Sequence, residues 1–299
     1  MKTIKTIAKL LLSFIIIITS FSVNELPVKA DLTGKGYAVL TTEGDLIFFR
    51  SEREYDNLYV GEVEDISGSK YSGTVFSNVE SGNHGWSNYS GSVYKVYVAD
   101  NNTIYPMDMR RWFYGCSGLT SADLRGFNTD KVTSMSEMFD SCWQLTNVNL
   151  SGLDTSQCTD MSYMFANCGR LTNVNLSGLD TSNVTNMRYM FGNSYVTNLD
   201  LRDLDTSSVT DMSCMFYYCH DLANLDLSGF NTSNVTTMDA MFYDCSSLAE
   251  LDLSSFNTGK VEDMSSMFGN CTSLTSLDLS SFNTGKLKIC PVCSVIVLS

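Results

Sequence analysis

The chain has 299 residues, long enough for one large domain or two ordinary ones, and its 33 Asp and Glu against 19 Lys and Arg give a formal charge of −14. This acidic balance argues against a nucleic-acid groove, because no clustered positive field is available to replace phosphate counterions. His84 and His220 are the only histidines, so metal sites built from several histidines are excluded. The ten cysteines are many for an ordinary chain, and their positions become the main question.

Residues 1–30 have the three-part layout of a secretory signal peptide. Lysines precede an apolar run from Leu10 to Phe21, and a polar stretch then ends at Ala30 with small residues that suit a signal peptidase. The apolar run is about 12 residues long where a membrane-spanning helix needs about 20, so cleavage after Ala30 is favoured over an anchor. Cleavage removes four Lys and one Glu, so the acidic excess rises from 14 to 17. We therefore expect a secreted or cell-surface protein with no membrane span after cleavage.

Residues 31–118 differ in composition from the rest and are expected to form an amino-terminal β-rich segment that caps the repeats. Tyr37–Leu40 and Leu46–Phe49 flank Glu43-Gly44, which predicts a hairpin, and Ser92–Val98 alternates as a strand. A separate ligand-binding domain is the alternative, although the segment holds little apolar sequence for a core of its own.

Residues 119–286 repeat with a period of 26, and a period of this length dictates the fold. A Met-Phe pair marks the register in six copies: Met138-Phe139, Met164-Phe165, Met190-Phe191, Met215-Phe216, Met241-Phe242 and Met267-Phe268. The step from Met190 to Met215 is one residue shorter than the others. Trp112-Phe113 marks the same register one repeat before the first Met-Phe pair.

The first part of each unit alternates apolar and polar residues, as in the segment LANLDLS at 222–228. Leu222, Leu225 and Leu227 are expected to point inward while Asp226 points outward, which is a strand pattern. An Asn/Asp-Thr pair such as Asn231-Thr232 follows, and its short polar side chains are expected to bond nearby backbone in a turn.

The second part of each unit has apolar residues at helical spacing. Met238, Met241, Phe242 and Cys245 stand at i, i+3, i+4 and i+7, which predicts the buried face of a short helix. The residue ahead of each predicted helix is one that can cap it by accepting a backbone N–H. These capping residues are Ser134, Asp160, Asn186, Asp211, Thr237 and Asp263.

No unit of 26 residues can bury its own Leu, Met and Phe, so the units are expected to stack, each covering the next. The predicted fold is an α/β, leucine-rich-repeat-like solenoid of about seven strand-turn-short-helix units with the β-rich cap at its amino end. Strands at about 4.8 Å spacing are expected to form a parallel sheet on one face, with the helices on the other.

Six cysteines recur at one repeat position on the inward face of the predicted helix, and Ser194 takes the place of a seventh. We expect a buried column of free thiols, with disulfides between units as the alternative for an exported chain. Ser194 splits the column into two runs of three, which cannot pair completely. Cys158 replaces a core valine, whereas Cys214 matches outer tyrosines and is expected to be exposed. The thiol column consists of Cys116, Cys142, Cys168, Cys219, Cys245 and Cys271.

The tail at 287–299 departs from the repeat. The register requires Asp-Met-Ser-Ser-Met-Phe at 289–294, where the chain has ICPVCS. The pair Cys290 and Cys293 resembles half of a zinc site, but no second pair lies nearby in sequence. One choice of codons for these residues spells the missing repeat when read one base out of frame. We infer that 287–299 is a frameshift product, which leaves the last unit without a capping repeat.

The units LANLDLSGFNTSNVTTMDAMFYDC and LAELDLSSFNTGKVEDMSSMFGNC, with the lead-in WFYGCSGLTS, resemble the BspA-like leucine-rich-repeat surface proteins of bacteria. The same repeat occurs in a family of bacterial surface lipoproteins, and the resemblance covers roughly 37–288. It implies a non-enzymatic surface or secreted protein, and some members of the family attach to host proteins or to other cells. The chain differs in having no cysteine before Cys116 to carry a lipid, and no recognisable wall anchor.

One polar residue per unit recurs on the outer face of the predicted sheet. The functional interpretation of this sheet-face row is a recognition strip for a basic or hydroxyl-rich partner, and the alternative is a solvated face kept polar for solubility. Calcium binding is disfavoured, because one side chain per unit supplies few oxygen ligands. The sheet-face row consists of Asp123, Asn149, Asn175, Asp200, Asp226, Asp252 and Asp278; Asn147, Asn173, Asn198, Asn224 and Glu250 stand two positions earlier.

Neither histidine has a supporting catalytic motif. His84 lies in a Gly/Asn/Ser loop, and His220 follows Cys219, but adjacent residues on a helix point apart. We therefore expect a non-catalytic protein without a metal or cofactor that binds a protein partner, such as a host extracellular-matrix or cell-surface protein. A structural surface protein, or a truncated copy with no ligand, is the alternative.

Overall fold

The computed structural model describes residues 34–81, 85–100 and 103–287. The predicted signal peptide, His84, and Cys290 and Cys293 of the tail lie outside these residues.

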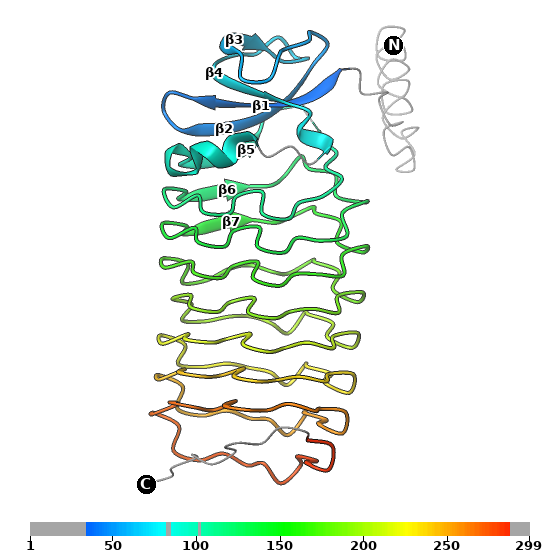
Figure 1. The fold of residues 1–299 in the computed structure, drawn as a ribbon, viewed down its shortest axis with the longest axis vertical. Coiled ribbons are helices and arrows are strands. Elements are labelled where there is room, and N and C mark those ends of the chain that lie inside the picture. Colours follow the sequence, from blue (N-terminus) through cyan, green and yellow to red (C-terminus); the bar gives the residue numbers. More distant parts are fainter. Residues whose placement is uncertain (1–33, 82–84, 101–102, 288–299) are drawn as a thin grey trace, which may run out of the picture. The chain divides into compact units, whose positions relative to one another are not determined.

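The amino-terminal part is a sheet that continues into the first repeats (Figure 1). The predicted hairpin is confirmed: the first two strands pair antiparallel around Gly44, whose positive φ of 85° suits the turn. The predicted third strand begins later than expected, at Lys95, because a 3₁₀ helix runs to Ser92. The sheet has the order β3-β4-β1-β2-β5-β6-β7. The elements are β1 (Lys35–Thr41), β2 (Asp45–Ser51), β3 (Val60–Glu64), β4 (Lys70–Ser77), η1 (Val79–Ser81), η2 (Gly85–Ser92), β5 (Lys95–Val98), β6 (Ser121–Asp123) and β7 (Asn147–Asn149).

Alternation in the first strands divides their side chains between two cores. Phe48 of β2 lies in the large core that continues through the repeats, whereas Phe49 lies in a small core on the other face of the sheet. Phe48 packs against Trp86, Trp112 and Phe127, with ring centroids 5.0 to 5.4 Å apart. This aromatic cluster joins the cap to the first repeat.

The predicted short helices are absent, and the described residues contain no α-helix. At each of these places the chain makes consecutive turns, with two residues of positive φ in every unit, such as Glu137 (55°) and Ser141 (64°). Successive N–H groups alternate between partners. Met138 donates to the Met135 carbonyl within the turn (3.3 Å), and Phe139 donates to Met164 of the next unit (3.0 Å). The expected helix is thus replaced by turns whose backbone bonds join neighbouring units. Each unit of the repeat is called a coil below.

The predicted strands are only partly present. Within the described residues, β6 and β7 are the only repeat segments assigned as strands. A longer series of parallel bridges runs through the predicted capping positions, from Ser134 and Asp160 to Thr237 and Asp263. Five of the six side chains accept a nearby N–H group, as Asp160 does from Ser162 (3.0 Å), whereas Thr237 Oγ1 donates to Asp239 (2.8 Å). The segment that follows is a turn and not a helix.

Buried threonines tie each coil to the next at the predicted Asn/Asp-Thr turns. Thr206 Oγ1 donates to the carbonyl of Asn231 (3.2 Å) and accepts that residue's N–H (2.8 Å). Thr232 forms the same pair with Asn257. The predicted bonds of the preceding Asn or Asp are confirmed, since Asn231 Oδ1 accepts the N–H of Ser233 (3.1 Å).

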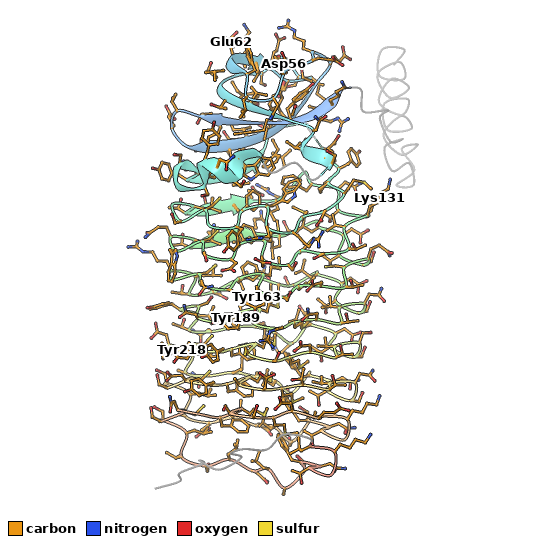
Figure 2. All side chains as sticks on the ribbon, in the orientation of Figure 1. Asp56, Glu62, Lys131, Tyr163, Tyr189 and Tyr218 are labelled. Atoms are coloured by element: carbon orange, nitrogen blue, oxygen red, sulfur yellow. The ribbon has the colours of Figure 1, made fainter. Side chains whose placement is uncertain are left out.

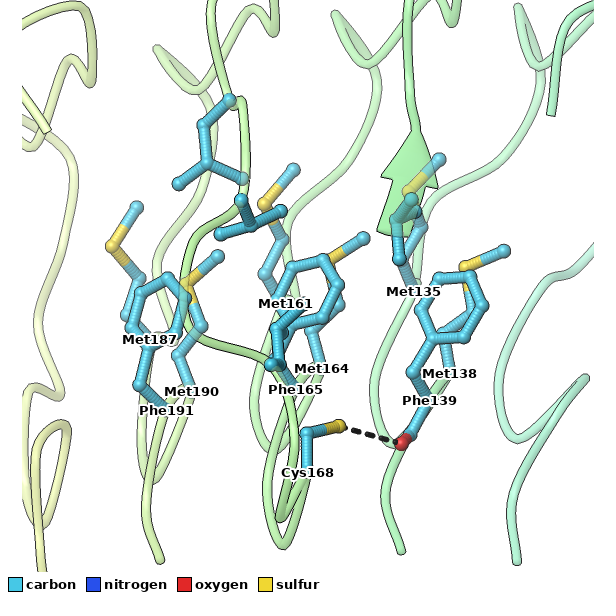
Figure 3. Close-up of a cluster of buried hydrophobic side chains, with 14 of the residues drawn as sticks. Met135, Met138, Phe139, Met161, Met164, Phe165, Cys168, Met187, Met190 and Phe191 are labelled. Atoms are coloured by element: carbon cyan, nitrogen blue, oxygen red, sulfur yellow. Dashed lines mark hydrogen bonds between the residues drawn. The ribbon is translucent and has the colours of Figure 1, made fainter. Parts of the chain in front are cut away.

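The interior of the coils consists of repeated Met and Phe side chains (Figure 3). Phe139, Phe165 and Phe191 stack with ring centroids 5.6 and 5.9 Å apart. The last described coil is less well covered: Phe242 is fully buried, whereas Phe268 is only partly buried. Each coil therefore depends on the next one for burial of its apolar residues.

Candidate functional site

A hollow of about 780 Å³ lies where the cap meets the first repeats. It is lined by residues of β5, β6 and β7, which follow one another along the sheet (Figure 1). Lys95 and Tyr97 come from β5, Asp123 ends β6, and Asn147 and Asn149 come from β7. Pockets of this size accommodate small molecules or a partner's side chains.

Asp123 is the centre of a bonded group in the hollow. The guanidinium of Arg125 donates through Nε and Nη2 to both carboxylate oxygens of Asp123, and the Nη2 contact is 2.5 Å. The side-chain amide of Asn149 donates to Asp123 Oδ1 at 3.2 Å. The hydrogen bond from Arg125 is the main cause that lowers the pKa of the Asp123 carboxyl. The pair is held in a fixed orientation, because a guanidinium and a carboxylate bond in two places.

Lys95 and Tyr97 give the hollow a cation and a phenol beyond this pair. Lys95 is exposed. Tyr97 is partly buried, and burial, followed by the nearby Asp45 carboxylate, raises the pKa of its phenol. The phenol therefore keeps its proton at neutral pH and can donate a hydrogen bond.

The sheet-face row has a structural role that the strand interpretation missed. Each of its seven side chains accepts the N–H of the residue two positions later, as Asp226 Oδ1 does from Ser228 at 3.0 Å. Asn175 makes the same bond to Ser177 at 2.9 Å, so the turn needs the shared oxygen and not the charge. The other bonds join Asp123 to Arg125, Asn149 to Ser151, Asp200 to Arg202, Asp252 to Ser254 and Asp278 to Ser280.

The carboxylates of the row remain ionised through these bonds. The Arg202 side chain lowers the pKa of Asp200 to about 2. The Ser228 hydroxyl is the main cause that lowers the pKa of Asp226, and the backbone N–H groups of Ser254 and Ser280 do so for Asp252 and Asp278. Asp226, Asp252 and Asp278 have no arginine two residues later, so the carboxyl-terminal half of the row is the more acidic.

Only two members of the row, Asp123 and Asn149, line the hollow, and a bond joins them. The sequence interpretation missed Lys95, Tyr97 and Arg125. Arg125 could have been found, because Asp-x-Arg occurs in the row only at Asp123 and Asp200.

The six residues of the thiol column lie on one internal line, and each Sγ from Cys142 onward faces a phenylalanine carbonyl of the preceding coil. Cys168 Sγ donates to Phe139 O at 3.3 Å (Figure 3). Ser194 fills its place in the same way, with Oγ 2.5 Å from Phe165 O. Burial raises the pKa of the Cys116 and Cys219 thiols to about 12. The remaining bonds join Cys142 to Phe113, Cys219 to Phe191, Cys245 to Phe216 and Cys271 to Phe242.

The prediction for Cys214 is wrong. It is 8% exposed, and burial raises the pKa of its thiol to about 11. Tyr189 and Tyr217 lie beside it on the outer surface, with ring centroids 5.5 Å apart. The side chain of Cys214 is shorter than these two, and it is covered by them and by the turn.

Cys219 and His220 do not form a reactive pair. Cys219 Sγ is buried against the Phe191 carbonyl, whereas His220 Nδ1 faces Ser246 Oγ (3.4 Å) and Asp244 (3.8 Å). No group of three or more His, Cys, Asp or Glu in the described ranges is arranged to hold a metal ion. In the same part of the chain, no helix has both the length and the apolar character to cross a bilayer.

The repeats match a family model described as Mycoplasma protein of unknown function, DUF285, over residues 107–222 and 193–291. The chain belongs to this family. The match covers the repeats of this chain together with the lead-in at Trp112-Phe113. A search of the curated proteins found no match to the chain.

Two solved structures are similar to this DUF285 member, and both are bacterial leucine-rich-repeat proteins. A leucine-rich repeat protein from Eubacterium ventriosum has 13% identity and a TM-score of 0.22, with 83% of this chain and 90% of the other covered. A leucine rich cell surface protein from Faecalibacterium prausnitzii has 12% identity and a TM-score of 0.16, with 84% and 95% covered. At these identities and TM-scores the likeness carries no argument about fold or function.

Proposed function

We propose that this DUF285 member is a non-catalytic, secreted or surface-displayed repeat protein that binds a protein partner through the sheet face around β5, β6 and β7. The observation that carries the proposal is the hollow, where Lys95, Tyr97 and the bonded group of Arg125, Asp123 and Asn149 converge. A concave site with a few fixed polar groups is the usual form of a binding site.

The sheet-face row extends the site beyond the hollow. Seven coils at about 4.8 Å spacing give a strip about 29 Å long, which is enough for an ordinary protein interface. Its carboxylates are held in place by hydrogen bonds of their own turns, so their ordering costs little conformational entropy when a partner binds. The strip begins with ion pairs at Asp123 and Asp200 and continues with unpaired carboxylates at Asp226, Asp252 and Asp278, so the expected partner surface is mixed near the hollow and basic farther along.

Surface display and the absence of catalysis are part of the same proposal. The signal-like segment at 1–30 and the family resemblance support export. The thiols of the column are buried and have raised pKa values. Ser246 and Asp244 face the same nitrogen of His220, whereas a catalytic triad uses different ring nitrogens for its nucleophile and its carboxylate.

The proposal is tested by binding of the purified protein to immobilised extracellular-matrix extract. A variant with Lys95→Gln and Arg125→Gln removes both cations of the hollow, and we expect its affinity to fall at least about tenfold. Lys131→Gln, an exposed lysine outside the hollow (labelled in Figure 2), is the matched control and is expected to bind like the wild type.

A second variant examines the strip. Asp226→Asn with Asp252→Asn keeps the turn oxygens, as Asn149 and Asn175 do, and removes the charge. Weaker binding of this variant assigns the basic part of the partner to the strip. Unchanged binding of both variants would contradict the proposal and would favour a structural surface protein without a ligand at this face.

A further inference from the structure

Four tyrosine rings form a continuous line across four coils at a different part of the repeat from the sheet face. This tyrosine row consists of Tyr163, Tyr189, Tyr217 and Tyr243, and all four are partly exposed. Tyr163 stacks on Tyr189 and Tyr217 on Tyr243, with centroids 4.9 and 5.3 Å apart. Tyr189 and Tyr217 join the two pairs, with centroids 5.5 Å apart and planes tilted by 39°. Tyr218 packs beside the row, 4.5 Å from Tyr217. Figure 2 labels Tyr163, Tyr189 and Tyr218, which follow one another along the stack of coils.

The row is continuous although its members come from two positions of the repeat. In two units the tyrosine is the first residue of a four-residue turn: Tyr163 with Ala166 at the end, and Tyr189 with Gly192 at the end. In the other two units the tyrosine is the last residue of the same turn: Tyr217 after Cys214 at the start, and Tyr243 after Ala240 at the start. The turn is closed each time by an N–H···O bond between its two ends, of 3.0 or 3.1 Å. In these four coils a tyrosine at one end of the turn accompanies a small residue at the other, and the line of rings is continuous.

The small residues make room for the rings. A Cβ at Gly192 would lie 2.2 Å from Cδ1 of Tyr189. A Cβ at Gly269, which follows the row, would lie 2.6 Å from Cδ2 of Tyr243. Non-bonded carbon atoms do not approach each other this closely. Each ring therefore occupies the space that a side chain at the glycine would fill.

The backbone conformation shows which substitutions the turn accepts at these positions. Tyr163 and Tyr189 have φ of 57° and 56°, and Tyr218 has 60°. This left-handed region favours Gly and Asn, and Asn occupies it in the same repeat at Asn167 and Asn193. The position of Tyr163 and Tyr189 has a positive φ in the other units as well, for example at Ala240, so a residue that accepts this conformation can replace the tyrosine without disturbing the turn.

The stacking determines what the row presents to a partner. Within each stacked pair the rings cover one another's faces, and the tilted rings of Tyr189 and Tyr217 lie close together between the pairs, so mainly ring edges and hydroxyl groups remain accessible. A sugar that stacks on an open ring face is therefore disfavoured. Fixed tyrosines lose little conformational freedom on binding, and Tyr is enriched at protein interfaces.

The charges around the row are mainly negative. Asp239 and Asp211 lie near Cys214, which opens the turn closed by Tyr217. Asp244 lies 3.8 Å from His220, whose ring packs on Tyr218 at 5.3 Å. The cation beside the row is Arg188, which donates to Tyr163 Oη (3.4 Å) and Ser213 Oγ (2.5 Å). A complementary partner is therefore positively charged.

We propose that the tyrosine row is a docking surface for an extended, cationic segment of a partner protein. Carboxylates beside the row pair with the cationic groups, and the ring edges receive the aliphatic stems of Arg or Lys. Four rings at coil spacing span about 15 Å, which an extended segment of about five residues covers. The surface is separate from the hollow, so the two proposals succeed or fail independently.

The test uses a fluorescent peptide of four Arg-Gly repeats and measures its binding by anisotropy. The variant Tyr163→Asn with Tyr189→Asn places at both positions a residue that the positive φ accepts, so the fold is expected to be kept, and thermal unfolding checks this. We expect the arginine peptide to bind the wild type and to lose about tenfold or more in affinity for this variant.

Three controls separate docking from general attraction to an acidic protein. A Gln-Gly peptide is expected to bind weakly, Tyr189→Phe to retain most of the affinity, and Tyr195→Asn, a tyrosine 47% exposed outside the row, to bind like the wild type. The proposal is overturned if the wild type fails to bind the arginine peptide. It is also overturned if the double variant binds it equally well, or if Tyr195→Asn weakens it as much.

Discussion

The cap and the coils bury similar apolar side chains but hold their backbones together in different ways. In the cap, β1 pairs with β2 and β4 in regular antiparallel ladders. In the coils, polar side chains make many of the links: Thr206 bonds both backbone groups of Asn231, and Cys168 bonds the carbonyl of Phe139.

The difference explains why the coils repeat their sequence and the cap does not. A ladder of N–H and C=O groups accepts many side chains, so β1 and β2 need only alternate apolar residues toward two cores. A coil held by side-chain bonds needs the same hydrogen-bonding group at the same place in every copy, as when Ser194 replaces a cysteine or Asn175 an aspartate. Stability of the cap is therefore expected to depend on volume, and that of the coils on hydrogen-bonding groups as well.

The largest effect is expected where the two regions meet. Phe48→Ala removes a fully buried ring that contacts Trp86, Trp112 and Phe127, and a cavity of this kind costs about 3–5 kcal/mol in free energy of unfolding. Urea unfolding followed by tryptophan fluorescence measures the loss. Tyr59→Ala, a cap residue 42% exposed, is the control and is expected to cost under about 1 kcal/mol. Equal losses in the two variants would show that the junction is not a packed core.

The next effect isolates a hydrogen-bonding group of the coils at constant volume. Thr206→Val leaves the N–H and C=O of Asn231 without their partner, and the expected loss is about 2–3 kcal/mol. Urea unfolding followed by circular dichroism measures it. Thr236→Val is the matched control, because Thr236 Oγ1 donates to Thr210 O at the surface, and under about 1 kcal/mol is expected. A loss as small as in the control would mean that the buried threonines act only by their shape.

Burial in the coils could be predicted from the sequence, although the element that produces it could not. Met238, Met241, Phe242 and Cys245 are all fully buried, as their spacing predicts. Consecutive turns closed by i to i+3 bonds place residues on one side at nearly helical intervals, so periodicity alone does not separate the two. The residues that break the helix, Ala240 and Asp244 in this unit, have positive φ without being glycine. Local propensity gives no warning there, because bonds to the next coil fix the conformation.

The candidate site was predicted for the repeats and missed for the cap. The sheet-face row follows from the register alone, and its seven side chains do recur on successive coils. The hollow depends on β5 pairing in parallel with β6, through Lys95 with Ser121 and Val96 with Ala122. This pairing joins segments of different sequence type about one repeat apart. The offset of Lys95 from Ser121 equals that of Ser121 from Asn147, so the repeat register extended one unit back would have aligned Tyr97 with Asp123. The signal was missed because the sequence around Tyr97 does not share the repeat motif.

A smaller effect is expected from the thiol column. Cys168→Ser keeps a donor to Phe139 O, as Ser194 does to Phe165 O, and should change the free energy of unfolding by less than about 1 kcal/mol. Cys168→Ala loses the donor and leaves a small void, at about 1–2 kcal/mol. Thermal unfolding in the presence of reductant compares them. A loss for serine as large as that for alanine would show that the column needs sulfur for its volume and not for its bond.

The smallest effect is a dependence of coil stability on pH that the cap is expected to share only weakly. Asp200 has its pKa lowered to about 2, and Asp226 and Asp252 have lowered values, because the folded chain donates hydrogen bonds to their ionised forms. A carboxyl with a lowered pKa stabilises the fold above its unfolded value near 4, and this contribution is lost as pH falls from about 4 to about 2. Replacement of all three by Asn keeps the turn oxygen, as at Asn149, without a titrating group. Melting temperatures of this variant and the wild type should therefore differ in slope on the acid side alone, and parallel curves would mean that other carboxyls cause the acid unfolding.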